Sequence, residues 1–393
     1  MKLAIIGGGS AGHAACALLA QPGSDVAIYT RSPAAWSSSV RLTWWEENSG
    51  EIDSIDGYPS LVTDDIEEAV YQAEVILFTL PVHLYKSMLR EVMAALSPGQ
   101  RPLLGWIYGQ GGIDWMLHEI AATREAMRPK FFSFGLIPWV VRTKVYGSHV
   151  TSYGPKANNT VFLSHSKDVS FLESSVLRPL TENFFQTGKS HFVDNMLSLT
   201  LSVDNQIIHP ARVYDLATRH SQGWKNRESV PFFYRDWSFE ATDTLISLDN
   251  DYEKIRTALR KEFPDESFIH MSSYLELERF SYAKATPDVQ KSFSESTTLS
   301  SIVTPISKVH GRFFLDRTHR FFLDDFSFGL EIAQWFGRQL GVKTKNIDGV
   351  LDFGTDYSAT ERMFNSKKDS GPTPSSYGLK TLSDVVLCGR SSH

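Results

Sequence analysis

One histidine in an apolar stretch is the first candidate for acid and base chemistry in this chain. His209 follows Asn205-Gln206-Ile207-Ile208 and precedes Pro210. Imidazole changes its charge near neutral pH, which suits it to proton transfer. Asn205 lies four residues earlier, so on a regular helix both side chains would project from one face, although a proline there should break or kink the helix. A single histidine in such a run is usually a core or surface residue, so a catalytic role requires a partner.

The candidate partner lies in a second polar segment, His319-Arg320-Phe321-Phe322-Leu323-Asp324-Asp325, just before a helix expected at 326–340. Asp325 either caps that helix or hydrogen bonds one imidazole nitrogen of His209, which would fix the tautomer and raise the basicity of the ring. Arg320 either offers a planar fork to a substrate carboxylate or forms a surface ion pair with Asp316 or Asp324. The sequence leaves both alternatives open.

A glycine-rich loop near the N-terminus predicts a nucleotide site. Gly7-Gly8-Gly9-Ser10-Ala11-Gly12 follows the strand-like run Leu3-Ala4-Ile5-Ile6 and matches G-x-G-x-x-G. In that motif Gly7 makes the tight turn, Gly9 lets the backbone approach a pyrophosphate, and Gly12 lets the helix approach the strand. The helix that begins near Ser10 and Ala11 would stabilise the phosphate charge.

The same residues also spell G-x-S-x-G, the elbow that holds a nucleophilic serine in hydrolases. Such an elbow needs earlier strands and a separate loop that supplies an oxyanion-hole amide. Ser10 has only nine residues before it. The nucleotide interpretation is therefore favoured.

Two strand ends are expected to face the cofactor. The second strand ends in Thr30-Arg31-Ser32, which offers a cation and hydroxyls where an acidic residue would select NAD. We therefore expect NADP(H) to be favoured, with NAD(H) possible, unless Arg31 merely covers the adenine or is solvated. Pro81 stops another strand, at 74–80.

Short apolar runs alternate with amphipathic segments in the first half of the chain, which is typical of a parallel sheet built from βαβ units. Strands are expected at 3–6, 26–29, 75–79, 103–106 and 131–134. A turn at Tyr153-Gly154-Pro155-Lys156 should join strands at 148–152 and 160–163 into an antiparallel hairpin at the sheet edge.

From about Asp194 the apolar period becomes helical, with segments expected at 196–219, 252–263 and 326–340, the last stopped by a left-handed Gly341. A final turn or helix is expected at 377–387. The predicted fold is α/β: a Rossmann-type, doubly wound parallel sheet over 1–193, followed by an all-helical domain over 194–393.

Composition narrows the function classes. The 393 residues are 42% hydrophobic and 21% charged with a formal net charge of −6, which indicates a folded globular protein. No Lys/Arg cluster favours nucleic acid or an anionic membrane, and no apolar run is long enough to cross a bilayer. Two cysteines, Cys16 and Cys388, make no disulfide framework, so a cytoplasmic location is expected. No metal is expected, because the other histidines considered have no second ligand at metal spacing: His83, His118, His165 and His310.

Four segments in this order and separation resemble the octopine/nopaline (opine) dehydrogenase family. They are the glycine loop to His13, Ser133-Phe134-Gly135-Leu136-Ile137-Pro138-Trp139 with Arg142, Asn205 to Pro210, and Arg320 to Asp325 leading into Gly329-Leu330. Val230-Pro231-Phe232-Phe233-Tyr234 and Tyr377-Gly378-Leu379-Lys380-Thr381-Leu382 add to the resemblance. It implies a Rossmann domain, a helical second domain and a substrate cleft between them.

The resemblance also implies a reaction, in which a 2-oxo acid condenses with the amine of an amino acid and the imine takes a hydride from the nicotinamide. His209 matches the acid/base histidine of the family, Asp325 the residue that orients it, and Arg320 the residue near the oxo acid carboxylate. Pyruvate is the oxo acid that the family implies. We expect the protein to be a monomer or a homodimer.

Three further residues are expected to contact substrate. Gln110 lies in a glycine-rich loop after a strand, at the sheet edge where ligands bind, and Asn205 shares the face of His209. Leu136 lies where a carboxylate for a guanidinium would be expected, and Gly135-Leu136 supplies none, which disfavours arginine. A smaller or neutral donor, such as alanine, glycine, β-alanine or taurine, or an apolar amino acid, is the hypothesis.

Two alternatives stay open. A ketopantoate or 3-hydroxyacid type of reductase shares the glycine loop and helical second domain but usually relies on a lysine and needs no amine. A non-catalytic NADPH-binding regulator would need the loop but not His209, Arg320 and Asp325.

Overall fold

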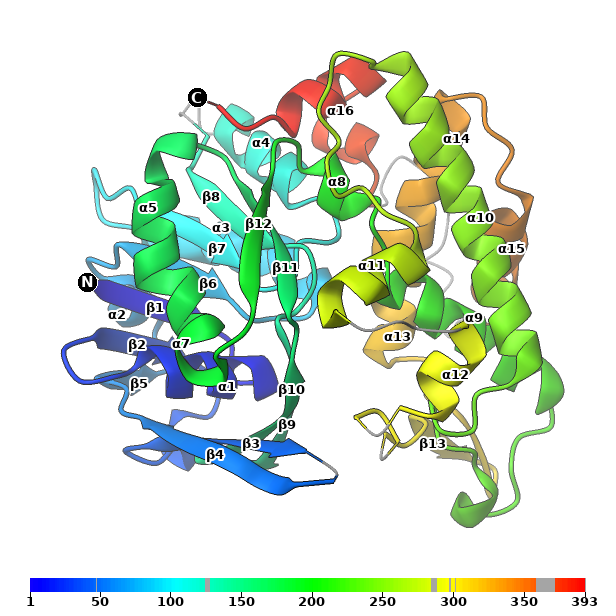
Figure 1. The fold of residues 1–393 in the computed structure, drawn as a ribbon, viewed down its shortest axis with the longest axis horizontal. Coiled ribbons are helices and arrows are strands. Elements are labelled where there is room, and N and C mark those ends of the chain that lie inside the picture. The colour runs from blue at the N-terminus through cyan, green and yellow to red at the C-terminus, as the bar shows by residue number, and fades with distance from the viewer. Residues whose placement is uncertain are drawn as a thin grey trace. The chain divides into compact units, whose positions relative to one another are not determined.

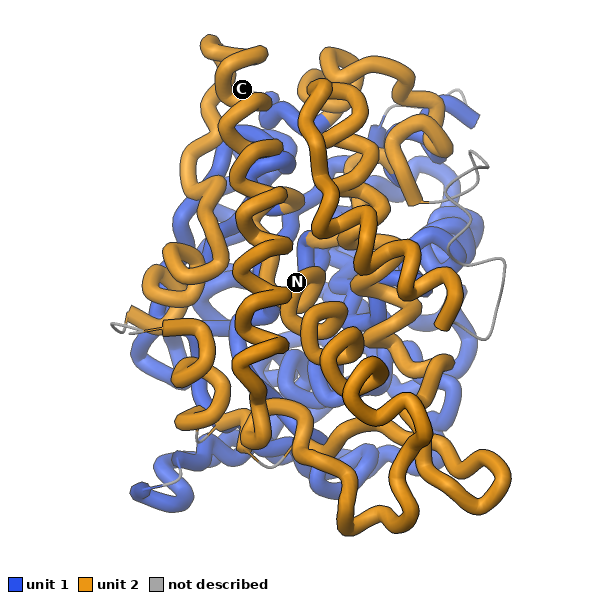
Figure 2. The backbone as a smooth tube through the Cα atoms, turned by 90° about the vertical axis from the view of Figure 1, so that its right-hand side faces the viewer, with its two compact units in different colours: residues 1–109, 116–199, 389–393 blue, residues 110–115, 200–388 orange. Residues whose placement is uncertain are grey.

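The computed structural model describes residues 1–46, 48–123, 128–283, 288–296, 298–300, 302–357 and 372–392. The chain divides into two units, coloured separately in Figure 2. Unit 1 comprises residues 1–109, 116–199 and 389–393, and unit 2 comprises residues 110–115 and 200–388. The domain bounds expected from the sequence, 1–193 and 194–393, remain predictions.

An eight-stranded sheet forms the centre of unit 1 (Figure 1), in the order β12-β11-β8-β7-β6-β1-β2-β5. Its strands are β1 (Lys2–Ile6), β2 (Asp25–Tyr29), β5 (Leu61–Thr63), β6 (Val75–Phe78), β7 (Leu103–Trp106), β8 (Phe131–Phe134), β11 (Asn158–Leu163) and β12 (Lys189–Val193). All pair in parallel except β11 with β8. The five strands predicted for the parallel sheet are confirmed. The strand order reverses at β1, and ligands of such sheets bind beyond the carboxyl ends of the strands at that point.

The predicted hairpin is wrong. A second sheet, in the order β4-β3-β10-β9, contains β3 (Val40–Glu46), β4 (Gly50–Gly57), β9 (Trp139–Val145) and β10 (His149–Pro155). β10 pairs with β9 and β3, whereas β11 pairs with β8 and β12 in the large sheet. Gly154 (φ +140°) lies inside β10 and not in a turn between β10 and β11. The antiparallel addition to the large sheet is therefore β11, which pairs antiparallel with β8, together with β12, which pairs in parallel with β11.

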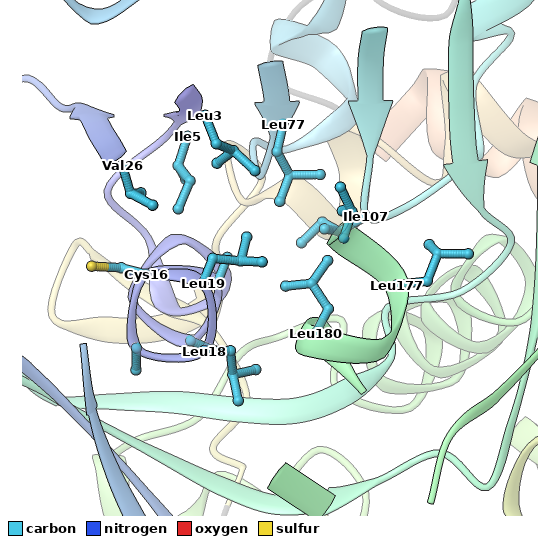
Figure 3. Packing of buried hydrophobic residues seen from close by; sticks show 14 of the residues in the cluster. Leu3, Ile5, Cys16, Leu18, Leu19, Val26, Leu77, Ile107, Leu177 and Leu180 are labelled. Atoms are coloured by element: carbon cyan, nitrogen blue, oxygen red, sulfur yellow. The ribbon is translucent and has the colours of Figure 1, made fainter. Parts of the chain in front are cut away.

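Helix α1 (Ser10–Leu19) lies between the two sheets of unit 1 and contacts strands of both. Figure 3 shows Leu19 of α1 facing Leu3 and Ile5 of β1. A helix that is buried on every side must be apolar all round, and residues 14–19 of α1 are all buried alanine, cysteine or leucine. The small side chains let both sheets approach, so the start of α1 is held firmly beside the glycine loop. The other helices of unit 1 are α2 (Ile66–Val70), α3 (Tyr85–Ala95), α4 (Ile113–Thr123, shared with unit 2), α5 (Val169–Leu172), α6 (Arg178–Leu180), α7 (Glu182–Phe185) and α8 (Leu197–Thr200, ending in unit 2).

In its described residues, unit 2 is helical except for the hairpin of β13 (Ile306–Val309) and β14 (Arg312–Leu315), which the prediction of an all-helical domain did not include. Its helices are α9 (Asn205–Arg219), α10 (Phe239–Glu262), α11 (Tyr274–Tyr282), α12 (Val289–Ser294), α13 (Arg320–Leu323), a π-helix (Phe326–Glu331) that continues as α14 (Ile332–Gln339), α15 (Lys345–Tyr357) and α16 (Leu382–Cys388). The predicted fold class is confirmed. Within the described part of the chain, no helix is long and apolar enough to span a membrane.

Three helix predictions need correction. The helix expected at 196–219 is interrupted between α8 and α9, because the Asp204 side chain caps α9 by accepting a hydrogen bond from the Asn205 amide. The expected break at Pro210 is absent, and α9 runs through it. Proline removes one backbone donor, and the buried face of α9 keeps the remaining turns in place. α10 begins at Phe239, earlier than expected, whereas the left-handed Gly341 (φ +65°) is confirmed.

Candidate active site

The glycine loop of unit 1 has the backbone geometry that a dinucleotide requires. Gly7 adopts φ +126°, a region that residues with a Cβ rarely enter. A Cβ on Gly12 would lie 1.9 Å from the Gly7 carbonyl oxygen, so only glycine lets α1 start so close to β1. A Cβ on Gly9 would meet no atom within 4 Å, which leaves open space where the backbone must approach a phosphate. The loop therefore fits a pyrophosphate.

The end of β6 supports this loop. The Thr79 hydroxyl contacts the carbonyl oxygens of Ile6 and Gly7, each at 3.1 Å. Pro81 follows, half-buried, and begins a short 3-10 helix. Sequence reasoning selected Pro81 and missed Thr79, although the position of Thr79 directly after a buried strand was a usable signal.

The hydroxyl of Ser10 is held by contacts with Thr143. Its hydroxyl oxygen accepts a hydrogen bond from the Thr143 amide at 3.0 Å and lies 3.0 Å from the Thr143 hydroxyl. No histidine hydrogen bonds it within the described residues, so it lacks the base of a hydrolase elbow. Ser10 and Ala11 offer a phosphate their backbone amides at the start of α1.

The end of β2 presents the three residues expected at the cofactor ribose. Thr30 is buried, whereas Arg31 and Ser32 are exposed. The Thr30 hydroxyl lies 2.8 Å from the hydroxyl of Tyr146 and weakly contacts the Ser32 amide. An exposed guanidinium and hydroxyls remain available to a ribose substituent.

In unit 2 the structure brings His209 and Asp325 together. His209 Nδ1 lies 2.7 Å from Asp325 Oδ2, and both side chains are almost fully buried. His209 Nε2 lies 2.9 Å from the hydroxyl of Tyr234. The Phe321 ring stacks on the imidazole with a centroid separation of 3.7 Å. Both nitrogens and one face of the ring are therefore held, which fixes its orientation.

Close packing of α9 against the π-helix sets the distance between His209 and Asp325. A Cβ on Gly329 would lie 2.6 Å from the side chain of Gln206, so glycine is needed where these elements meet. Asp325 directly precedes the π-helix, and His209 lies three residues after Gln206 on α9. The two catalytic candidates are thus fixed by the same contact.

Arg212, one turn after His209, positions Tyr234. Its guanidinium is fully buried and donates to the carbonyl oxygens of Phe233 (2.9 Å), Phe232 (3.1 Å) and Asp236 (2.8 Å). It also pairs with Asp215 at 2.7 Å. Three of these contacts hold the loop on both sides of Tyr234, and the fourth stays within α9. Sequence reasoning missed Arg212 and Tyr234, because nothing in the local pattern shows that this loop returns to α9.

The electrostatics of the pair follow from burial. Burial is the main cause that raises the pKa of the Asp325 carboxyl well above its usual range, and Asp324 and Asp204 add to the rise. Arg320 opposes it. Burial disfavours the negatively charged form of the Asp325 carboxyl. A proton therefore stays between this carboxyl and Nδ1 of His209, which are 2.7 Å apart. Nε2 then remains the nitrogen that can exchange a proton with another group.

The remaining predicted residues are placed as follows. Arg320 is exposed, with its guanidinium carbon 5.4 Å from the Phe321 ring centroid, and no ion pair links it to another residue in the described ranges. Asn205 is half-buried at the start of α9. Gln110 is buried in unit 2, where its amide donates to the Ser202 carbonyl oxygen at 3.3 Å. Leu136 is buried in unit 1. Across the residues described, no group of three or more His, Cys, Asp or Glu side chains could hold a metal ion.

A buried acid near this site makes stability depend on pH. Glu331 ends the π-helix, and burial is the main cause that raises its pKa to about 8, opposed by a hydrogen bond with Ser327. The folded state therefore holds a proton that the unfolded state releases, so the free energy of unfolding falls as pH rises from about 4.5 to about 8. Glu331→Gln should stabilise the protein by about 5 kcal/mol at alkaline pH relative to wild type and by little at acidic pH. Denaturant unfolding at both pH values measures this, and parallel pH dependence of the two proteins would contradict it.

Two family models match the chain. Residues 192–358 match the α-helical domain of NAD/NADP octopine/nopaline dehydrogenase, and residues 2–109 match the N-terminus of NAD-dependent glycerol-3-phosphate dehydrogenase. Residues 192–358 therefore carry the helical domain of the octopine/nopaline dehydrogenase family. The tauropine dehydrogenase of Arabella iricolor is 24% identical over 411 residues, covering 98% of this chain and 99% of the relative.

Solved structures of opine dehydrogenases share the fold. Octopine dehydrogenase with NADH and L-arginine superposes with a TM-score of 0.78 at 17% identity, covering 100% of this chain and 99% of the other. Yersinopine dehydrogenase with NADP+ gives 0.60 at 14% identity, covering 93% and 94%. The family is one of NAD(P)-dependent oxidoreductases.

Proposed function

We propose that this protein is an opine dehydrogenase, which joins a 2-oxo acid to the amino group of an amino acid by reductive condensation. The observation that carries the proposal is the buried His209–Asp325 pair at 2.7 Å, in a chain that also has a dinucleotide loop. The carbonyl and amine lose water to give an imine, and hydride and a proton reduce the imine to a secondary amine. The bound nicotinamide supplies the hydride.

The residues of unit 2 would handle the proton. Asp325 holds Nδ1, so the proton that moves is the one at Nε2 of His209. Loss of water from the carbinolamine needs an acid and attack by the amine needs a base, and one imidazole serves both near neutral pH. Arg320, exposed and close to the ring that stacks on His209, would bind the oxo acid carboxylate, for which pyruvate is our proposal. Asn205 and Gln110 would contact substrate.

The amino donor is proposed to be small or neutral. The buried Leu136 leaves the segment after β8 without a carboxylate for a guanidinium. We propose alanine, glycine, β-alanine, taurine or an apolar amino acid in preference to arginine. Saturation by arginine at micromolar concentrations would contradict this assignment.

The cofactor is proposed to be NADP(H). Arg31 is exposed at the end of β2 beside Thr30, and this strand end carries no acidic residue for a ribose 2′-hydroxyl. Arg31→Ala should lower kcat/KM for NADPH by about 10- to 100-fold and for NADH by less than about threefold, because a guanidinium–phosphate hydrogen bond is charge-assisted. Arg41→Ala is the matched control, since Arg41 lies in the second sheet of unit 1 and pairs with Asp56 at 2.8 Å. Equal losses with both cofactors would refute the preference.

Omission of substrates tests the reaction itself. Loss of NAD(P)H absorbance is followed with oxo acid alone, amine alone and both together. Oxidation that requires both establishes reductive condensation. Oxidation with the oxo acid alone would assign the chain to the simple 2-oxo acid reductases, and no oxidation under any pairing would favour a non-catalytic binder.

A further inference from the structure

The hairpin of β9 and β10 is tied at three points to the glycine loop, α1 and the end of β2 in unit 1. Thr143 on β9 contacts Ser10 at 3.0 Å. In the hairpin turn, the Gly147 amide donates to Nε2 of His13 at 2.7 Å. The Tyr146 hydroxyl lies 2.8 Å from that of Thr30, at the end of β2. The turn is therefore built against the elements that hold the cofactor.

His13 acts as the link, and its hydrogen bonds fix its charge. Nε2 accepts from an amide, so Nδ1 carries the proton and donates to the Gly9 carbonyl oxygen at 2.8 Å. The neutral ring stacks on Trp36 with a centroid separation of 4.3 Å and meets Tyr146 edge-on at 5.3 Å. One side chain thus joins the phosphate loop to the turn that carries Tyr146.

The hairpin turn restricts the position of the Tyr146 side chain. Gly147 adopts φ +78°, and a Cβ there would lie 2.0 Å from the Ala35 carbonyl oxygen, so the turn is pressed against the segment that follows Ser32. A Cβ on Gly8 would lie 2.4 Å from the Thr30 hydroxyl and 2.8 Å from the Tyr146 hydroxyl. The phenol therefore reaches the glycine loop where it meets the end of β2.

That position is where this fold places the adenosine ribose. Tyr146 keeps 43% of its surface exposed, although its hydroxyl reaches the buried Thr30. A phenol both donates and accepts, so it can bond a ribose hydroxyl or a ribose phosphate. We infer that Tyr146 is a cofactor-binding residue whose hydroxyl hydrogen bonds the adenosine ribose at its 2′ position, together with Thr30 and Arg31. The inference rests on nicotinamide dinucleotide binding and not on the proposed condensation.

The test is Tyr146→Phe, which removes only the hydroxyl. Affinities for NADP+, NAD+ and nicotinamide mononucleotide, which lacks the adenosine, are measured by calorimetry or tryptophan fluorescence. We expect a loss of about tenfold for NADP+ and about threefold for NAD+, since a charged acceptor gives the stronger bond. Nicotinamide mononucleotide should bind as to wild type.

Tyr153→Phe is the matched control. Tyr153 lies on β10 and packs edge-on against Trp45 with a centroid separation of 5.7 Å, so its replacement should leave all three affinities unchanged. Wild-type affinity of Tyr146→Phe for both dinucleotides, or an equal loss for the mononucleotide, would overturn the inference. If the wild-type protein binds both dinucleotides but does not catalyse the condensation, the proposed function alone is overturned.

Discussion

Replacing His209 with alanine is expected to lower kcat for the condensation by about 10³-fold and to leave NAD(P)H affinity unchanged. The imidazole is the group that Asp325 and Tyr234 hold at both nitrogens, and its removal leaves the imine without a positioned proton donor. The glycine loop belongs to the other unit, so cofactor binding should survive. Single-turnover kinetics together with cofactor titration measure the two effects separately.

His220→Ala is the matched control for this experiment. His220 follows the last turn of the same helix and packs against Trp224, so its loss should leave kcat near the wild-type value. Turnover of His209→Ala at the wild-type rate would show that the proton carrier has been wrongly assigned. A parallel loss of cofactor affinity would indicate a general disruption of the fold.

Arg212→Met should lower the free energy of unfolding by about 3–5 kcal/mol. The substitution removes a fully buried charge and leaves Asp215 and three backbone carbonyl groups without this donor. The loop that carries Tyr234 should also loosen, so kcat should fall while cofactor affinity stays constant. Urea denaturation measures the stability change.

Arg219→Met is the matched control, because it removes a charge that pairs with the same carboxylate from an exposed side chain. Arg219 also pairs with Asp215, at 2.5 Å, but its side chain is 42% exposed, so the loss should stay below about 1 kcal/mol. Arg212→Lys keeps the charge without the planar fork, so its loss in the free energy of unfolding should lie between those of Arg219→Met and Arg212→Met. This variant gives a readout if Arg212→Met does not fold. A loss below about 1 kcal/mol for Arg212→Met would contradict the structural role given to this side chain.

The strands β1, β2, β6, β7 and β8 could be predicted because they are buried along most of their length and therefore appear as continuous apolar runs in the sequence. β9 and β10 could not be placed in the same way. Residues alternate in burial along β9, and β10 pairs in parallel with β3, which lies about a hundred residues earlier in the chain. Such non-local pairing leaves no local pattern in the sequence. The strand at 148–152 was therefore predicted to pair with 160–163, whereas it pairs with β9 and β3.

The candidate site shows the same limit. Asp325 was accessible to sequence reasoning because a carboxylate before a helix and an isolated histidine are each recognisable, and the structure places them 2.7 Å apart. Tyr234 and Tyr146 come from loops whose side chains reach their partners only through the tertiary fold. Of the break or kink predicted at Pro210, the break is wrong, since α9 continues through the proline despite one missing backbone donor.

The central claim is that nitrogen from the amine becomes bonded to the carbon of the oxo acid. The most direct measurement is mass spectrometry of the products after incubation with NADPH, pyruvate and alanine labelled isotopically at nitrogen. We predict a secondary amine that retains the label and has the mass of alanine plus a carboxyethyl group, formed in step with NADPH oxidation. NADPH oxidation that yields lactate and leaves the labelled alanine unchanged would contradict the account.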